Sequence, residues 1–403
     1  MTEPDGRPDG RPDGATAGRR RARRRDPGLP QARHRYQDRG GFTVEICRNE
    51  RQFARVADAW QRLHRHCRTA TAFQSHAWLY SWWLSYGVPG RLRIVLVRRG
   101  PVLVAAAPLM LVRKPFPALV PLGADITDYG DVLLDDHCAE EAARALAGAL
   151  AETAGHAVID LREVRTGGAA ERLYAHWHGP RLRRADSACL ELPGVPLDDL
   201  FARLPAPQAR QARAGLGVLN ALGIDQRPVP WEDVPVAVRT LVRLHRKGRK
   251  AAPEHVQLRF SMHLARAVRE MARNGQARMT EFVLDETVIA VVLVLISPGL
   301  TCGYLYGTHP DLRESEADVA MMMLHTCAGQ GTGRTVLSLP RQDGTNPYRW
   351  RPEVRTNHRY LLGCRRSVVL LWLRALRASV DGRPAGGERS ARRPRHGAGA
   401  RIP

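Results

Sequence analysis

Two short stretches carry acidic and aromatic side chains that could contact a substrate. Asp128-Tyr129-Gly130-Asp131 follows a strand-like segment. Asp and Gly commonly form a turn at such a place, and the alternative is an edge that binds substrate through Tyr129 and Asp131. Glu281 lies at the centre of a strand predicted at 277–284. A carboxylate there could act as a general base through a water molecule.

Histidine, cysteine and glycine are placed less favourably for chemistry. His64 and His66, like His176 and His178, are two residues apart and resemble a metal site only superficially, so we expect no metal site. The seven cysteines are widely spaced and form no CxxC pair, which indicates neither a disulfide framework nor a zinc site. The glycines of 329–333 follow a helix and precede a strand. Phosphate loops have the reverse order, so we predict a helix cap.

The elements that must position these residues are read from the spacing of apolar side chains. The pattern predicts an α/β (α+β) chain with mixed sheets, whose strands come mostly in hairpins and not in a Rossmann alternation. Strands or hairpins are expected at 42–48, 91–113, 157–163, 184–192, 277–284, 288–306, 334–339 and 357–362, with an extended segment at 118–134. Helices are expected at 49–67, 75–86, 139–154, 169–177, 197–222, 233–248, 260–274, 315–329 and 345–350.

The chain also repeats itself. Two strand-like segments at 91–109 recur at 277–295 with an offset of 186 residues, and the sequence Arg-Leu-His-Arg at 62–65 recurs at 243–246. The shared order of helices followed by a hairpin predicts two equivalent halves in tandem. The Trp-rich helix at 75–86 places its indole rings at helical spacing, which favours packing in the core.

The net charge of +22, from 62 Lys and Arg against 40 Asp and Glu, lies partly in the ends of the chain. Residues 1–40 carry 11 − 6 = +5 and residues 365–403 carry 10 − 2 = +8, which leaves +9 for the middle. This distribution argues against a body that binds nucleic acid. We predict a disordered basic tail (1–40), a first half (41–195), a second half (196–364), a basic amphipathic helix (365–380) and a disordered tail (381–403).

Two apolar segments raise the question of membrane contact. Residues 287–308 carry no charge, but Ser297-Pro298-Gly299 interrupts them, so we predict a hairpin and no transmembrane segment. Residues 367–376 could lie on an anionic membrane surface or dock as a terminal helix on the body. The N-terminus has no apolar core, which predicts no secretory signal and a cytoplasmic protein. Arginines flank the second segment: Arg365, Arg366, Arg374 and Arg377.

Several blocks of sequence resemble one family. They read AWQRL (59–63), TAFQSHAWLYSWWLSYG (71–87), VAAAPLML (104–111), TDYGDVLLD (127–135), GYLYGTHPDL (303–312) and GTNPYRWRPEV (344–354). With them, 42–364 resembles the GNAT-fold acyltransferases of the CelD/BcsL (cellulose-biosynthesis acetyltransferase) group, related to the Fem transferases. The resemblance implies an enzyme with a tandem pair of GNAT-like halves, each a hairpin-rich sheet flanked by helices, and an acyl donor in the second half.

The resemblance also implies where the donor binds. In such enzymes an acyl thioester lies between two splayed strands, where a backbone N–H polarises its carbonyl, and pyrophosphate meets the next helix N-terminus. It assigns acetyl-CoA or another acyl-CoA to Tyr304, Tyr306, Arg313 and Ser315. In the loop 309–320, however, Glu316 and Asp318 occupy the glycine positions of the phosphate pattern. Their charges oppose pyrophosphate, which favours a Fem-like aminoacyl-tRNA donor or a half that has lost its donor.

Catalytic roles follow from the same resemblance. Tyr348 matches the tyrosine that protonates the departing thiolate. The interpretation that Tyr348 and Trp350 only pack the end of the sheet stays open. Asp128 is the first-half counterpart of the proposed base Glu281. Acceptor contacts are assigned to Tyr129, Asp131, His245, Asp343, Arg349 and Trp350.

Two hypotheses of function result. In the first, the protein transfers an acyl group to an amine or hydroxyl of a sugar, a glycan precursor or a secondary metabolite. In the second, it keeps the fold without catalysis or binds nucleic acid; contact with tRNA would also suit a Fem-like transferase. We expect the acceptor in the cleft between the halves, with the loops 115–131 and 246–259 setting its identity. The sequence predicts neither the acceptor nor the oligomeric state.

Overall fold

The computed structural model describes residues 36–37, 41–123, 126–246, 254–309, 319–329, 335–339 and 350–381. The predicted tails lie outside this part of the chain, apart from Tyr36–Gln37 and Asp381.

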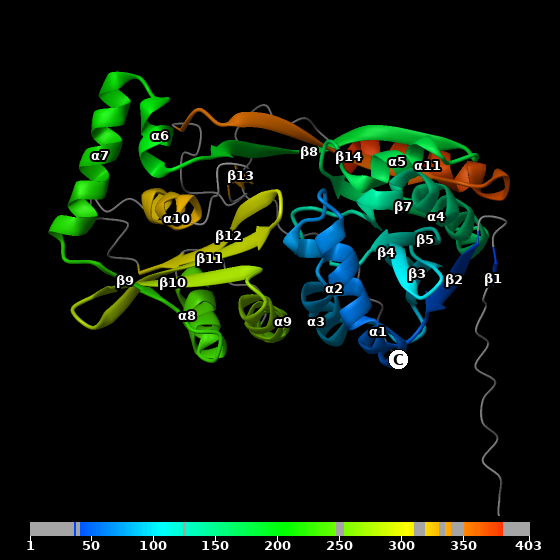
Figure 1. Ribbon diagram of the computed structural model, residues 1–403, viewed down its shortest axis with the longest axis horizontal. Coiled ribbons are helices and arrows are strands. Elements are labelled where there is room, and N and C mark those ends of the chain that lie inside the picture. The colour runs from blue at the N-terminus through cyan, green and yellow to red at the C-terminus, as the bar shows by residue number, and fades with distance from the viewer. Residues whose placement is uncertain are drawn as a thin grey trace, which may run out of the picture. The chain divides into compact units, whose positions relative to one another are not determined.

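The described strands form one large mixed sheet, which confirms the predicted α/β class (Figure 1). Its order is β1-β2-β3-β4-β5-β7-β14-β8-β13-β12-β11-β10-β9, and the short β6 pairs with β4. The first-half strands are β1 (Tyr36–Gln37), β2 (Phe42–Cys47), β3 (Leu92–Arg99), β4 (Val102–Val112), β5 (Ala118–Pro121), β6 (Leu133–Leu134), β7 (Val158–Val164) and β8 (Arg181–Gly194). The second-half strands are β9 (Asp225–Pro228), β10 (Ala277–Leu284), β11 (Thr287–Ser297), β12 (Leu300–Thr308), β13 (Thr335–Ser338) and β14 (Glu353–Leu362).

The predicted repeat is present as two matching hairpins. β3 and β4 are antiparallel neighbours, and so are β10 and β11. The uncharged segment 287–308 is the antiparallel pair β11 and β12, as predicted, because the Pro298-Gly299 turn reverses the chain. Within the described residues, no helix is long and apolar enough to cross a membrane.

The halves exchange their last strands. β14 lies between β7 and β8, and β8 lies between β14 and β13. Each half therefore contributes a strand to the sheet of the other, and Figure 1 shows β8 and β14 running side by side between them. This exchange was not apparent from the sequence, because apolar periodicity does not specify which distant strands pair.

Helices cover both faces of the sheet. α4 and α5 pack on one face of the first-half strands, and α11 packs on the opposite face at β7 and β14. α2, α3, α8 and α9 share a third core, which buries Trp78, Trp82 and Trp83 as predicted. In the first half the helices are α1 (Glu50–Arg55), α2 (Ala57–His66), η1 (Ala72–Gln74), α3 (His76–Tyr86), η2 (Asp136–Cys138), α4 (Ala139–Ala154) and α5 (Ala169–Ala175). The others are α6 (Leu197–Ala202), α7 (Ala206–Ala221), α8 (Val234–Arg246), α9 (Glu254–Arg273), α10 (Val319–Ala328), η5 (Arg365–Ser367) and α11 (Val368–Asp381).

The helix predicted over 197–222 is two helices. α6 ends at Ala202 and α7 begins at Ala206, because Pro205 has no N–H to donate and its ring disfavours a helical conformation at the preceding residue.

Candidate functional site

Two parallel strands of the second half are paired over three residues. β12 pairs with β13 at Leu300↔Val336, Thr301↔Leu337 and Cys302↔Ser338, where β13 ends. β12 continues to Thr308 against β11. We call the region around Cys302 and Ser338, where this pairing ends, the second-half wedge.

A β-bulge lies at the mouth of this wedge. Leu293 of β11 faces Leu305 and Val294 faces Gly303, so Tyr304 is the extra residue on β12. Bulges bend a strand and redirect a side chain, and they are over-represented beside active sites. Here the bulge accompanies the burial of the Tyr304 ring in the core formed by α3 and α9.

A loop from the first half crosses to this wedge. β5 and β6 pair with the same edge of β4, and the chain leaves the sheet between them. We call residues 126–132 the crossing loop. The Tyr129 hydroxyl lies 2.6 Å from Ser338 Oγ, and the Tyr304 hydroxyl donates to the Ile126 carbonyl at 2.7 Å. Cys302 Sγ is 3.9 Å from an Asp128 carboxylate oxygen, so residues from both halves meet at the second-half wedge.

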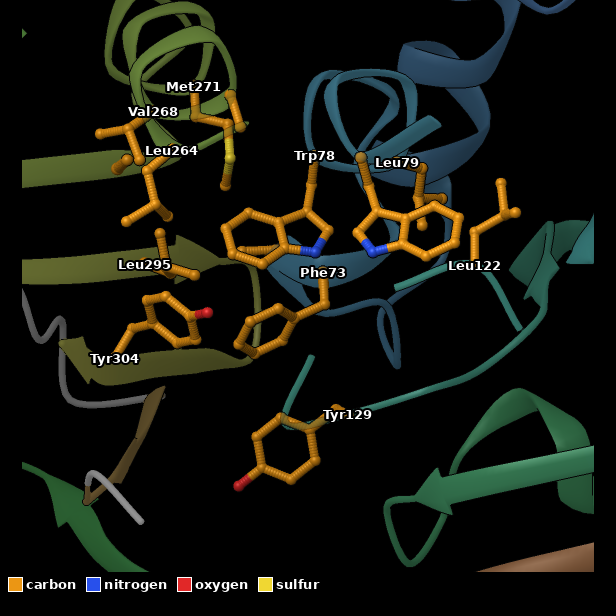
Figure 2. Packing of buried hydrophobic residues seen from close by; sticks show 14 of the residues in the cluster. Phe73, Trp78, Leu79, Leu122, Tyr129, Leu264, Val268, Met271, Leu295 and Tyr304 are labelled. Carbon is orange, nitrogen blue, oxygen red and sulfur yellow. The ribbon is translucent and has the colours of Figure 1, made fainter. Parts of the chain in front are cut away.

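Aromatic rings form one wall of the site (Figure 2). The ring of Tyr304 lies edge-on to Trp78, with centroids 5.2 Å apart, and 5.5 Å from Phe73. The same part of the chain anchors the crossing loop, because Gln74 Nε2 donates to the Tyr129 carbonyl at 2.7 Å and Trp78 Nε1 donates to Thr127 Oγ1 at 3.0 Å. The block 71–87 of the first half therefore positions the crossing loop.

The two tyrosines of the wedge are buried. Burial raises the pKa of both Tyr129 and Tyr304 well above the ordinary value, and Cys302 adds to the effect. Both phenols therefore stay protonated at neutral pH, so neither serves as a base. Because Tyr304 gives its proton to the Ile126 carbonyl, its main effect is to fix the crossing loop.

The equivalent region in the first half is closed. β5 and β7 pair in parallel at Ala118↔Val158 and Leu119↔Ile159, and the crossing loop then enters between them. Gly130 N donates to the Glu163 carbonyl at 3.0 Å. A Cβ at Gly130 would lie 2.5 Å from the Arg162 carbonyl oxygen, so only glycine fits here without a shift. We call this filled region the first-half wedge.

Asp131, predicted to bind substrate, caps a helix in the first-half wedge. Its carboxylate accepts from Ala169 N and Ala170 N at the start of α5, each at 2.8 Å, and from Val132 N at 2.8 Å. Burial raises the pKa of Asp131 to about 7, although these three backbone donors oppose the shift. Asp131 therefore has a structural role, as in the turn interpretation, whereas Asp128 and Tyr129 of the same motif face the second-half wedge.

Glu281, predicted as a base, does not join the tyrosines of the wedge. It lies on β10, and the register Glu281↔Val291↔Gly307 places β11 between it and β12. Two strand spacings correspond to about 10 Å between the backbones. Burial raises the pKa of Glu281, with a further contribution from Asp233, which precedes α8.

His245 is at the back of β12. Its Nδ1 donates to the Tyr306 carbonyl at 2.7 Å, on the far side of the bulge from Cys302. Gly307 allows this close contact, since a Cβ there would lie 2.5 Å from the Leu241 carbonyl of α8. The contact ties α8 to the strand that carries Tyr304.

Trp350 packs in the core of the second half. Its ring is buried and stacks on Phe201 with centroids 6.0 Å apart, which matches the packing interpretation of this residue. Five other residues assigned to the donor, to acid catalysis or to the acceptor lie outside the described residues and stay predictions: Arg313, Ser315, Asp343, Tyr348 and Arg349.

The fold gives His66 an acidic neighbour that the sequence did not suggest. Its Nδ1 lies 3.4 Å from Asp135, whose other oxygen is 2.9 Å from His137 Nδ1 and accepts from His137 N at 3.0 Å. Ligand-type atoms of these three residues lie within 4.8 Å of one another. The cap of η2 accounts for the arrangement, and the expectation of no metal stays a prediction.

Sequence reasoning missed the residues of other elements that contact the crossing loop. Ser338 and Cys302 sit at the point where β12 and β13 separate, and Gln74 holds the loop. The only available signal was the resemblance of the block 71–87, since the partners lie 55 to 209 residues from Tyr129.

Known proteins resemble this chain at two levels. Residues 208–351 match the family model described as an acetyltransferase (GNAT) domain, which spans β9 to β13 and the second-half wedge. The second half carries a GNAT-fold acetyltransferase domain. No curated protein sequence matches the chain significantly.

Solved structures resemble the chain over most of its length. FemX is 12% identical with a TM-score of 0.54, and the match covers 79% of this chain and 98% of FemX. The C-terminal domain (DUF2156) of a putative lysylphosphatidylglycerol synthetase from Agrobacterium fabrum is 10% identical with a TM-score of 0.50, over 81% and 96% of the two chains. At these identities the likeness shows a shared fold, in which the first half is included.

Proposed function

We propose that this protein is an acyltransferase that holds its acyl donor in the second-half wedge and transfers the acyl group to an amine or hydroxyl. The acceptor class we favour is a sugar, a glycan precursor or a secondary metabolite. The observation that carries the proposal is that Asp128 and Tyr129 of the crossing loop meet Cys302 and Ser338 at the end of the β12–β13 pairing, within the GNAT domain, while the first-half wedge is filled.

The chain supplies three elements of such a reaction. The parallel pair β12–β13 is the place where a GNAT domain would polarise an acyl carbonyl by a backbone N–H. The rings of Phe73, Trp78 and Tyr304 exclude water from one side. Asp128, half-buried beside Cys302, is the residue we assign as general base for the acceptor.

Acyl-CoA is the donor that a GNAT domain implies, and when bound it would supply the activated thioester. The bulge at Tyr304 of β12 lies where the acyl end of such a molecule would bind. The pyrophosphate contacts fall in 309–318, of which only His309 is described. Glu316 and Asp318 in that segment favour the second candidate, a Fem-like transferase that uses an aminoacyl-tRNA.

The test combines donor binding with a matched pair of variants. Titration calorimetry with acetyl-CoA measures binding, and transfer to a panel of amino sugars is followed by thiol release. We expect Asp128→Asn to keep donor binding and to slow transfer by about 10²–10⁴-fold. The control, Asp198→Asn on the surface of α6, should change neither. If acetyl-CoA fails to bind but a charged tRNA binds and donates, the donor is aminoacyl-tRNA; if neither binds at millimolar and micromolar concentration respectively, the proposal is wrong.

A further inference from the structure

The last helix, α11, is attached to the body by one of its faces. Leu371 and Ala375 are buried against Val158 and Leu361 of β7 and β14. Arg374 Nε donates to Asp160 at 2.9 Å, and this guanidinium is itself buried. The helix is therefore held in a defined orientation, as expected for a helix that docks on the body.

The opposite face of α11 is apolar and exposed. Val369 is 70% exposed, Trp372 60%, Leu373 39% and Leu376 64%. Their spacing of three, four and seven residues places all four on one stripe, which we call the outer stripe. Single exposed apolar residues are ordinary on a protein surface, whereas a contiguous stripe of large side chains marks an interaction surface.

Basic residues border the outer stripe. Arg365 and Arg366 in η5 precede α11, Arg377 follows Leu376, and all three are exposed. Within 368–381 the only acidic residue is Asp381, at the end of the helix. Cations at a helix N-terminus oppose the helix dipole, so Arg365 and Arg366 are poorly placed for helix stability. Their position suits an anionic partner.

Two occupants other than a membrane fit the stripe poorly. Residues 382–403 carry six Arg and one Glu, with Ile402 as the only large aliphatic residue, so this segment has little apolar surface with which to cover a tryptophan and two leucines. A second copy would bring two sets of arginines together, and like charges repel. An anionic bilayer matches both the apolar stripe and the positive rim.

We propose that α11 binds the surface of anionic lipid bilayers, with Val369, Trp372, Leu373 and Leu376 inserted among the headgroups. Amphipathic helices bind in this way when an apolar face is combined with Lys or Arg, and Trp is favoured at the membrane interface. Arginines near a bilayer that contains anionic lipids strengthen this binding by electrostatic attraction. This surface lies on α11, apart from the second-half wedge, and the proposal does not depend on the acyltransferase reaction.

Vesicle flotation of the full chain tests the proposal. Vesicles of phosphatidylglycerol and phosphatidylcholine are compared with vesicles of phosphatidylcholine alone. We expect binding to the anionic vesicles, and a loss of at least about tenfold in the partition coefficient for the double variant Trp372→Ser/Leu376→Ser, since two large side chains no longer insert. The control Val354→Ser changes a residue of β14 that is 60% exposed and lies outside the stripe, and it should bind as the unchanged protein does.

The double variant keeps every charge of the chain, so it separates the stripe from the basic tails. Unchanged thermal unfolding and circular dichroism will show that it folds. If the unchanged protein does not float with anionic vesicles, or if the double variant floats equally well, the proposal is wrong and any binding comes from tail electrostatics. Concentration-dependent dimerisation in light scattering that the double variant abolishes would instead assign the stripe to a second copy, and would also overturn the proposal.

Discussion

The two wedges of this protein begin in the same way and end differently. In each, two parallel strands are paired over two or three residues, and their surroundings beyond this pairing differ. In the first half this region holds Gly130 and Asp131, bonded to the Glu163 carbonyl and to the start of α5. In the second half it is bordered by Tyr304 and by Asp128 and Tyr129 of the same crossing loop.

One segment therefore closes the first wedge and lines the second. The loop from Asp128 to Asp131 alternates between these tasks, with its first two residues directed to β12 and β13 and its last two to β7 and α5. The difference suggests that the first half serves as a structural support for the second-half wedge, and we call the first half the frame. Four changes test this comparison, beginning with the largest expected effect.

Asp160→Asn should destabilise the frame most. Burial acts to raise the pKa of Asp160, yet Arg359, Arg162 and Arg374 hold that pKa below the ordinary range. The variant leaves two buried guanidinium groups without their counter-ion, and we expect a loss of about 3–5 kcal/mol in the free energy of unfolding, measured in urea at pH 7. The control Asp225→Asn removes an exposed pair with Arg227 and should cost less than about 1 kcal/mol. Equal losses in the free energy of unfolding in the two variants would contradict the structural role of the first half.

Gly130→Ala should disturb both wedges. The new Cβ meets the Arg162 carbonyl, and we expect about 2 kcal/mol of lost stability. Because the shift is passed to Tyr129, donor binding in the second-half wedge should weaken as well. The control Gly215→Ala lies in α7 with open space around it and should be neutral or slightly stabilising. Loss of stability with unchanged donor binding would show that the wedges are independent.

Asp131→Asn should change how stability depends on pH. The folded pKa of about 7 exceeds the ordinary 3.8, so the folded state binds the proton more tightly than the unfolded state does. This contribution is present below pH 4 and is lost as the pH rises to 7. The free energy of unfolding of the unchanged protein, relative to that of the Asp131→Asn variant, should fall by up to about 1.4 kcal/mol per pH unit in this window, measured by urea unfolding. If the difference in unfolding free energy does not change with pH, the Asp131 carboxylate is more hydrated than its burial indicates.

His263→Phe should have the opposite pH dependence and the smallest effect at neutral pH. His263 is buried on α9, edge-on to Trp78 at 4.6 Å, and burial lowers its pKa from 6.5 to about 3. The neutral ring therefore contributes stability above pH 6.5 that is lost as the pH falls toward 3. We expect the variant to unfold less readily in acid and to match the unchanged protein within about 1 kcal/mol at pH 7. If the free energies of unfolding of the two proteins fall equally as the pH is lowered, this expectation is wrong.

The sequence predicted what depends on neighbours along the chain. The hairpins at β3–β4 and β10–β11 follow from alternation of apolar residues, and the burial of Trp78, Trp82 and Trp83 follows from helical spacing. Contacts between distant segments were not predictable in this way. The Tyr129–Ser338 pair joins residues 209 apart, and the capping of α5 by Asp131 spans 38 or more. The motif Asp-Tyr-Gly-Asp was therefore ambiguous until the partners of each residue were known.

The exchange of β8 and β14 has a consequence for how the chain is made. The first-half sheet receives its inner strand from residues 353–362, so that sheet is incomplete while the second half is still being synthesised. Contacts of such long sequence separation carry a large loop-closure entropy and slow folding. Exposed edges of β7 and β8 would persist until Leu362 leaves the ribosome. A chain released before that residue would have neither a complete frame nor a stable wedge, which makes translation of the last strand the step that commits both halves to the folded state.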